Sequence, residues 1–235
     1  MSEITVKNLC VKYGEQVVFD SFDATFEKDK INVILGGSGV GKSTLIGAIA
    51  GLVEHDGDIE GVDGGISYIF QKDRLIPSIS VYKNLDLILK SVYKDEEDRR
   101  KRIEEMLEIL EIADCRDKRP TEISGGQAQR ACMARAFLYP SEVLLMDEPF
   151  KALDTALRHR LFEWLFRLCE ISPKTIIFVT HAIDECLLSA DKYMVIGGKP
   201  AGIVLEGKID TDKQSRKLTD TNLVDIRNSL LGAIN

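Results

Sequence analysis

One glycine-rich segment, Gly36-Gly37-Ser38-Gly39-Val40-Gly41-Lys42-Ser43 with Thr44 behind it, constrains this chain more than any other. It matches the pattern G-x-x-x-x-G-K-[ST], and it lies between an apolar run at 31–35 that predicts a strand and a run at 45–50 that predicts a helix. Four glycines in six positions let the backbone curl, so that successive N–H groups point into one concavity. A concavity of this kind at the start of a helix binds anions.

Two side chains of this segment indicate which anion it binds. Lys42 adds a full charge that can reach the outer phosphates of a nucleotide, and Ser43 adds a hydroxyl of the hard-oxygen type that Mg²⁺ prefers. A glycine-rich turn that merely starts a helix is the simpler interpretation. The strand, the spacing, the lysine and the serine together favour a site for a nucleoside triphosphate.

Length, charge and cysteine content exclude several classes of protein. A chain of 235 residues suits one domain, alone or with an inserted subdomain. The net charge of −7 disfavours nucleic acid and anionic membrane surfaces as partners. The five cysteines are scattered without a C-x-x-C pair, which predicts reduced thiols and a cytosolic compartment. We expect neither export nor a membrane span, because no signal segment and no run of about 18 apolar residues occurs.

The first third of the chain has β character. Residues 4–6 and 9–11 are β-like runs that switch phase between them, and 22–26 alternates with period two. Tyr13 lies at the turn between them, either as a half-buried hairpin residue or as a ring that stacks on adenine. A short strand near 58–60 and a further strand at 66–70, which ends at Gln71, complete this part.

The next segment has a helical pattern, with helices expected at 80–90 and 95–112. The basic cluster Arg99 to Arg102 suggests a polyphosphate-binding patch at first sight. However, Glu96, Glu97 and Asp98 each precede a basic residue by four positions, which is the favourable order for ion pairs on a helix. We therefore expect a solvated helix face there.

A second glycine pair occurs in Ser124-Gly125-Gly126-Gln127, directly before a helix-capable run at 128–138. A serine and two glycines at a helix N-terminus form either a second anion cradle or simply a capped helix start.

Carboxylates and a histidine follow the later strands. The buried-strand run 142–146 ends at Asp147 and Glu148, and the run 174–180 ends at His181 after a helix expected at 155–170. Open α/β sheets bind ligands at the carboxyl ends of their strands. Asp147 can hold Mg²⁺ through its water shell, and Glu148 can orient and deprotonate a water molecule. We expect Gln71, the Asp147-Glu148 pair and His181 to converge on one phosphate.

The tail predicts a hairpin around 197–202 and a last helix with one apolar face. That face should carry Leu223, Ile226, Leu230 and Leu231.

In this order, the motifs from Tyr13 to about Ile196 resemble those of the ATP-binding subunit of an ABC transporter. The resemblance implies an α/β fold with a P-loop NTPase core, an N-terminal antiparallel β subdomain and an inserted helical subdomain. It implies one ABC ATPase domain over 1–235, which divides into a β part with the Walker A core at 1–71, a helical subdomain at 72–122, a second core part at 123–210 and a helical tail at 211–235.

The resemblance also assigns roles to residues. Tyr13 would stack on adenine, and the other ATP-binding residues would be Gly36, Gly37, Ser38, Gly39, Val40, Gly41, Lys42, Ser43 and Thr44 of the Walker A loop and Ser124, Gly125, Gly126 and Gln127 of the signature. The catalytic residues would be Glu148, His181, Lys42 and Gln71, and the Mg²⁺ ligands Ser43, Gln71 and Asp147. Ala152, Leu153 and Asp154 would form the D-loop at the dimer interface.

The partners implied are a second copy in a head-to-tail dimer, with each ATP between the Walker A loop of one copy and the signature of the other, and transmembrane permease subunits. An external solute-binding protein would belong to the complex without contacting this chain, and nucleic acid would not bind. The chain would be cytoplasmic and peripheral on the inner face of the cell membrane. Residues 71–77, 80–85 and 148–154 are similar to bacterial importer ATPases of the nitrate, sulfonate and taurine group.

Two other classes of function stay open at this point. A soluble ABC ATPase of cofactor (Fe–S) assembly would share the motifs, whereas a small-molecule kinase would leave Ser124 to Gln127 unexplained. The chain departs from the family pattern at Gly37, at Ile123 and at Lys151, which stands where a small residue is common.

Overall fold

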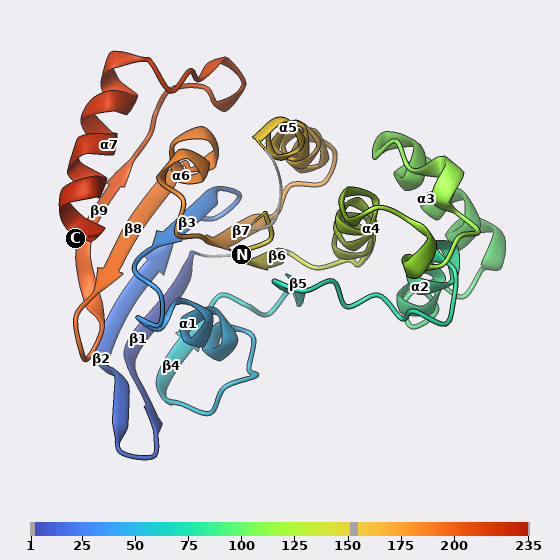
Figure 1. Ribbon diagram of the computed structural model, residues 1–235. Helices are drawn as coiled ribbons and strands as arrows, with labels where there is room; N and C mark the ends of the chain where they lie inside the picture. The colour runs from blue at the N-terminus through green and yellow to red at the C-terminus, as the bar shows by residue number, and fades with distance from the viewer. Residues whose placement is uncertain (1–2, 151–154, 235) are drawn as a thin grey trace. The chain divides into compact units, whose positions relative to one another are not determined.

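The computed structural model describes residues 3–150 and 155–234 (Figure 1). The chain forms two compact units that interleave along the sequence. The first unit comprises Met1–Ile66, Glu142–Glu148 and Lys174–Asn235, and the second comprises Ser67–Ser141 and Pro149–Pro173. The second unit therefore holds the helices at 125–138 and 155–171 besides the segment 72–122 that was expected to form a helical subdomain.

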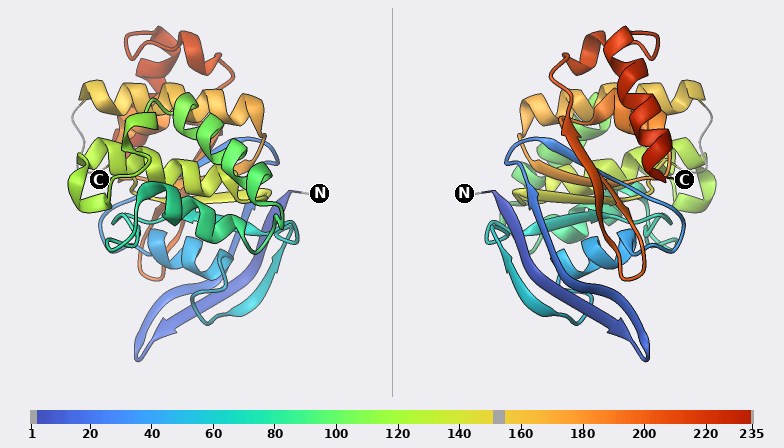
Figure 2. Two further views of the ribbon diagram at one scale, coloured as in Figure 1. Left: turned by 90° about the vertical axis from the view of Figure 1, so that its right-hand side faces the viewer. Right: turned by 90° about the vertical axis from the view of Figure 1, so that its left-hand side faces the viewer.

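The first unit begins with an antiparallel sheet in the order β2-β1-β4 (Figure 2). Its strands are β1 (Ile4–Tyr13), β2 (Gln16–Phe26) and β4 (Asp56–Glu60). The predicted change of phase in β1 is confirmed, because Val6 and Leu9 are both buried and the register shifts between them. The shift occurs at Asn8, whose φ of 50° breaks the regular pleat.

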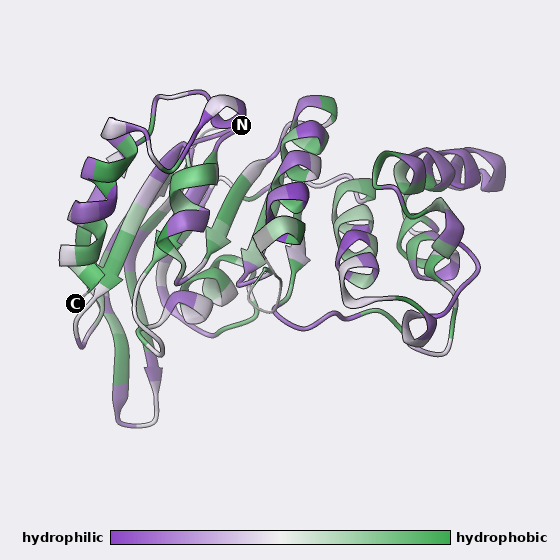
Figure 3. Cartoon of the chain, turned by 45° about the horizontal axis from the view of Figure 1, so that its top comes forward, coloured by the Kyte–Doolittle hydropathy of each residue, from purple (hydrophilic) through white to green (hydrophobic). Residues whose placement is uncertain are grey.

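A mainly parallel sheet forms the centre of the first unit, with strands in the order β6-β7-β3-β8-β9. These strands are β3 (Ile31–Leu35), β6 (Val143–Asp147), β7 (Thr175–Val179), β8 (Lys192–Gly197) and β9 (Gly202–Lys208). Only β9 is antiparallel to its neighbour in this order. Every residue of β3 and β7 is buried, which explains why both strands are mainly apolar; the central sheet is coloured largely as hydrophobic in Figure 3. The buried polar side chain of Asn32 in β3 donates to the carbonyls of Glu27 and Ile176.

Helices cover both faces of this sheet. On one face lies α1 (Lys42–Ile49), and on the other lie α6 (Ile183–Ser189) and α7 (Thr221–Ile234) (Figures 1 and 2). A short 3₁₀ turn at Lys213–Ser215 precedes α7.

The second unit is helical. The chain enters it within β5 (Ile66–Ile69), and its helices are α2 (Val81–Leu89), α3 (Glu96–Ile109), α4 (Gly125–Leu138) and α5 (Thr155–Ile171), with 3₁₀ turns at Ala113–Cys115 and Pro120–Glu122. Ser80 and Asp95 cap α2 and α3, because each side chain accepts a hydrogen bond from a backbone N–H of the first turn. No helix among the described residues is long and apolar enough to cross a membrane.

The prediction that Arg99 lies on a solvated face is wrong. Its side chain is only 7% exposed, and Nε donates to Asp86 Oδ1 at 2.7 Å. Nη1 donates to the carbonyls of Tyr93 and Lys94 at 2.9 Å each, so the guanidinium joins α3 to the segment before it. The prediction fails because Asp86, the partner of Arg99, lies on another helix, outside the i, i+4 pattern.

The rest of the basic cluster is exposed as expected, although not every pairing is the expected one. Arg102 pairs with Asp98 at i, i+4 as predicted. Arg100 pairs with Glu97 instead of Glu96, and Lys101 pairs with Glu105 instead of Glu97.

Two other helix predictions need correction. The helix expected at 95–112 ends at Ile109, because Glu111 adopts a φ of 54°, which a right-handed helix does not allow. In α7, Leu223 and Leu230 are buried as predicted, but Leu231 is 47% exposed and does not belong to the buried face.

All five cysteines are free thiols, as predicted, and they differ in burial. Burial raises the pKa of the Cys132 thiol to about 12, and it also raises the pKa values of Cys115 and Cys186. Cys10 lies in β1, the middle strand of the antiparallel sheet, and is partly exposed.

We expect Cys10 to react with iodoacetamide at pH 8 in the native protein while Cys132 stays unmodified, because only the thiolate is a nucleophile and the Cys132 thiolate hardly forms. Peptide mass mapping after a timed reaction measures this, with protein unfolded in guanidinium chloride as the control in which both react. Equal native rates would contradict the packing of α4 described here.

Candidate nucleotide site

Three strands of the first unit end side by side at one edge of the parallel sheet. Ile34 in β3 is level with Val179 in β7, and Asp147 in β6 is level with the same Val179. Backbone hydrogen bonds continue past the strands, from Thr180 N to Ile34 O at 3.1 Å and from Glu148 N to Val179 O at 2.9 Å. The phosphate loop, the carboxylate pair and His181 therefore leave the sheet at neighbouring positions.

The loop between β3 and α1 depends on glycine at Gly41. Gly41 has a φ of 117°, and a Cβ at this position would lie 2.7 Å from Val18 Cγ1 and 3.0 Å from Phe19 Cζ. No other residue adopts this backbone readily, so the loop can turn into α1 only with glycine here.

Lys42 lies over the same loop. Its Nζ donates to the carbonyls of Gly36 and Gly37, at 2.9 Å each, and the side chain is buried. The ammonium group is thus fixed at the N-terminus of α1, where the positive end of the helix already favours an anion.

Ser43 and Asp147, two of the residues expected to hold Mg²⁺, lie side by side in the structure. Ser43 Oγ donates to Asp147 Oδ1 at 2.9 Å, although the two residues are 104 positions apart. A hydroxyl and a carboxylate at this distance are hard oxygen donors of the kind that Mg²⁺ takes, so the residues present fit such an ion.

Glu148 and His181 form the second pair of the site. Glu148 Oε1 lies 3.2 Å from His181 Nδ1, and the exposed fractions of the two side chains are 14% and 51%. Glu148 has a φ of 42°, a left-handed backbone conformation that costs roughly 1–3 kcal/mol for a residue other than glycine. Strain of this kind is held by the surrounding structure, and the bond from Glu148 N to Val179 O contributes to that constraint.

Tyr13 ends β1 opposite Gln16, and its ring is 53% exposed. Tyr13 is therefore a hairpin residue with about half of its surface covered, which agrees with the first of the two predicted alternatives. The ring face is accessible for stacking on a planar base.

The other predicted site residues belong to the second unit. Gln71 lies in an exposed bend after β5. Ser124 and Gln127 form a capping box, in which Ser124 Oγ accepts from Gln127 N at 3.2 Å and Gln127 Oε1 accepts from Ser124 N at 2.9 Å. The start of α4 is therefore capped, which is one of the two alternatives predicted for this segment. Ala152, Leu153 and Asp154 of the predicted D-loop, and Lys151, lie outside the described residues.

The two glycines of this segment differ in their surroundings. A Cβ on Gly125 would meet nothing within 4 Å, whereas a Cβ on Gly126 would lie 2.7 Å from Leu157 Cδ2. Gly125 thus leaves an open approach to the N-terminus of α4, and Gly126 permits close packing of α4 against α5.

The sequence analysis did not identify the residues that hold the backbone after β7 in place by hydrogen bonds. Thr180 Oγ1 accepts from Ala182 N at 3.0 Å and donates to the buried carboxylate of Glu185. Arg216, near the end of the chain, donates to four backbone carbonyls. No spacing rule in the sequence signals such long-range partners.

Comparison with known proteins identifies the family. The profile of the ABC transporter family matches residues 19–151, and the chain belongs to that family. It is 35% identical over 234 residues to the aliphatic sulfonates import ATP-binding protein SsuB 1 of Paracoccus denitrificans, with 98% of this chain and 93% of the relative covered. It is 34% identical over 209 residues to the maltose/maltodextrin import ATP-binding protein MalK of Vibrio vulnificus, with 84% of this chain covered.

The match spans 56% of that MalK relative, so the chain covers little more than half the length of such proteins. Among solved structures, cbiO1 from Clostridium perfringens, part of the ABC transporter complex cbiONQ, has a TM-score of 0.80 at 25% identity, with 97% and 94% of the two chains covered. MJ0796, a bacterial ABC transporter cassette described as dimeric, has a TM-score of 0.77 at 27% identity, with 89% and 100% covered.

The predicted fold is confirmed by these structures, which are ABC ATPase cassettes with the P-loop fold. The relatives are named as ATP-binding proteins, in agreement with the phosphate loop seen in the sequence.

We expect Gly41→Ala to lower the free energy of unfolding by about 1–3 kcal/mol, because the new Cβ meets Val18 and Phe19 and the backbone is strained. Gly37→Ala is the matched control for stability, since a Cβ there meets nothing within 4 Å. Urea unfolding measures both. Equal stability of the two variants would show that Gly41 is not required by the loop.

Proposed function

We propose that this chain binds and hydrolyses ATP as the energising subunit of an ABC importer, with two copies closing head to tail on two ATP molecules. The observation that carries the proposal is the meeting of Ser43 with Asp147, and of Glu148 with His181, beside the phosphate loop. Both pairs bring together residues that are far apart in the sequence and that phosphoryl transfer requires in one place.

The roles proposed for the residues follow from this geometry. The loop backbone from Gly36 to Gly41, Lys42 and Thr44 cradle the phosphates, while Tyr13 stacks on the adenine. Ser43, Asp147 and Gln71 hold Mg²⁺, which when bound neutralises charge on the phosphate oxygens. Glu148 orients a water molecule and accepts its proton, and His181 donates a hydrogen bond to the outer phosphate.

The contributions of these groups differ in size. A positioned donor such as Lys42 or His181 is typically worth about 3–4 kcal/mol of transition-state stabilisation. General-base help from Glu148 contributes about 10²- to 10⁴-fold in rate. Stacking on Tyr13 adds roughly 1–3 kcal/mol, mainly to binding, if base stacking in nucleic-acid proteins is a guide.

The second copy explains why one chain carries two cradles. In the proposed dimer each ATP lies between the Walker A loop of one copy and Ser124, Gly125, Gly126 and Gln127 of the other. The open approach at Gly125 is compatible with an anion at the N-terminus of α4. ATP contacts two surfaces in the closed state and one in the open state, so it shifts the population toward closure. The D-loop residues Ala152, Leu153 and Asp154 line the same proposed interface.

The importer assignment rests on the relatives. A relative that matches nearly the whole chain is named as an aliphatic sulfonates import protein, and others are named as maltose/maltodextrin import proteins, so import is the property that the names share. We infer that this chain energises import through a separate permease. We propose a solute of the sulfonate type, in the wider nitrate, sulfonate and taurine group. In this assembly the chain is peripheral on the cytoplasmic face of the membrane, and the external solute-binding protein contacts only the permease.

The alternative function, an ABC ATPase of cofactor (Fe–S) assembly, is not favoured by these relatives. Co-purification of the tagged chain from detergent-solubilised membranes discriminates between the two functions. Recovery of a polytopic membrane protein in a fixed ratio supports the importer. Recovery only of cofactor-assembly proteins from the soluble fraction would contradict it.

We expect Glu148→Gln to lower ATP turnover at least 100-fold while ATP binding is retained, because the amide keeps the shape and loses the base. The variant should accumulate as a closed dimer with ATP, detectable by size-exclusion chromatography with light scattering. Glu142→Gln, at the exposed start of the same strand run, is the matched control. Near-normal turnover by Glu148→Gln would remove Glu148 from the proposed role.

A further inference from the structure

The helix that follows His181 is too short to hold its own position. α6 comprises seven residues, and no side chain caps it at Ala182. Isolated helices shorter than about 12–15 residues are marginal in water, so contacts with other parts of the first unit determine where α6 lies. Those contacts come from β3 and from the C-terminal segment, defined here as residues 209–234.

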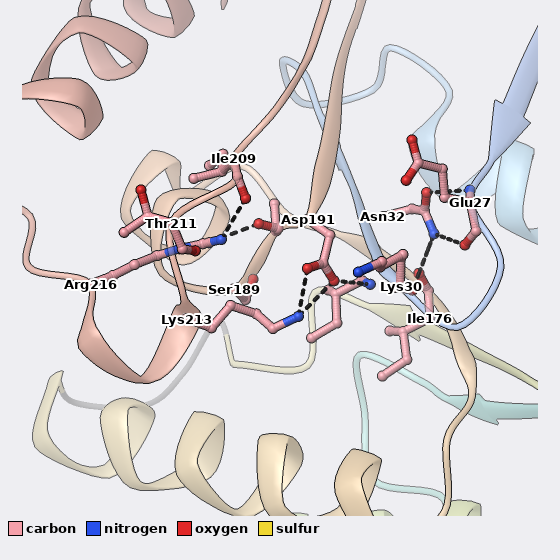
Figure 4. A network of polar contacts seen from close by, with 12 residues as sticks. Glu27, Lys30, Asn32, Ile176, Ser189, Asp191, Ile209, Thr211, Lys213 and Arg216 are labelled. Carbon is pink, nitrogen blue, oxygen red and sulfur yellow. Dashed lines mark hydrogen bonds and ion pairs between the residues drawn. The ribbon is translucent and has the colours of Figure 1, made fainter.

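Arg216 of this segment holds the C-terminal end of α6. Its Nη1 donates to the carbonyls of Leu187 at 3.0 Å and Ala190 at 2.8 Å, which lie in the last turn and just beyond it. The carbonyls at the end of a helix lack partners within the helix, and a positive charge is favourable there. Nη2 donates to Ile209 O at 2.9 Å and Nε to Thr211 O at 2.9 Å, so one buried guanidinium joins α6 to the chain that follows β9 (Figure 4).

Arg227 of the same segment holds the other end of α6. Its Nη2 lies 2.8 Å from Asp184 Oδ1, and Asp184 is in the first turn of α6, three residues after His181. Arg227 is in α7, which packs against α6. The C-terminal segment therefore binds α6 at both ends.

The segment is itself fixed to the strand that leads into the phosphate loop. Lys213 Nζ donates to both carboxylate oxygens of Asp191 at 2.7 Å, and Asp191 Oδ2 accepts from Ile31 N at 2.8 Å (Figure 4). Because Ile31 is the first residue of β3, these hydrogen bonds connect the C-terminal segment, which contacts α6, to the central strand of the sheet.

Hydrogen bonds also connect α6 to the residues on either side of His181. The hydroxyl of Thr180 accepts from Ala182 N and donates to the carboxylate of Glu185, and Ser189 Oγ donates to Glu185 O at 2.6 Å. A shift of α6 would thus move residues 180–182, on which the distance from His181 to Glu148 depends.

We propose that Arg216 and Arg227 are positioning residues for His181, through which the C-terminal segment sets the geometry of the Glu148–His181 pair. This inference rests on the proposed role of His181 in ATP hydrolysis. It makes the C-terminal segment a control element of turnover, although none of its residues is among those proposed to bind the nucleotide.

The test is a double-mutant cycle on Arg227 and Asp184 in the full chain. Arg227→Ala and Asp184→Ala should each lower kcat roughly two- to fivefold, the range expected for an ion pair of this exposure, with KM for ATP unchanged. The double variant should lose no more than either single variant, and the exchanged pair Asp184→Arg with Arg227→Asp should recover part of the loss. Lys208→Ala is the matched control, because its ion pair with Glu27, at 2.6 Å, lies in the first unit away from α6.

A second readout separates positioning from general stability. Hydrogen exchange of the amides at 181–186 should accelerate in Arg227→Ala and in Arg216→Lys, which keeps the charge but cannot reach four carbonyls, and not in Lys208→Ala. The inference would be overturned if the Arg227 and Arg216 variants kept the wild-type kcat and the wild-type exchange rates while His181→Ala abolished turnover. That result would leave the proposed role of His181 intact. Normal turnover by His181→Ala would instead contradict the proposed role of His181 and the inference with it.

Discussion

The register between β3, β7 and β6 is the constraint on which the site depends. Because β7 pairs in parallel with both neighbours, the residues that follow Leu35, Asp147 and Val179 leave the sheet at one edge. The strands are buried on both faces, so a shift in register would disrupt the packing of side chains on both faces, and the sheet resists it. A phosphate loop, a carboxylate pair and a histidine that are distant in sequence thereby become neighbours.

The sequence predicted those parts of the molecule that depend on local pattern. The buried strands, the helices α2 and α3 and the phase change near Asn8 all follow from the periodicity of apolar residues. The family resemblance added the order of the motifs and the fold that the solved structures confirm.

The sequence could not predict features that arise only from tertiary packing. Arg99 looks like a surface residue until Asp86 from the preceding helix comes within 2.7 Å. The left-handed backbone at Glu148 has no signature in residue type, since glutamate rarely adopts it. Arg216 is one of several basic residues in a polar tail, beside Lys213 and Lys217, and only the folded chain brings four carbonyls around it.

The proposed mechanism makes each chain half of a working unit, since the Walker A loop and the signature of one copy serve different nucleotides. The most direct test is ATP turnover per chain measured over a wide range of protein concentration, with the molecular mass followed in parallel. If two copies form the working unit, turnover per chain rises with protein concentration as dimers form, and Ser124→Arg abolishes turnover at every concentration. Full turnover by monomers, independent of protein concentration and insensitive to Ser124→Arg, would contradict the proposal that two copies form the working unit.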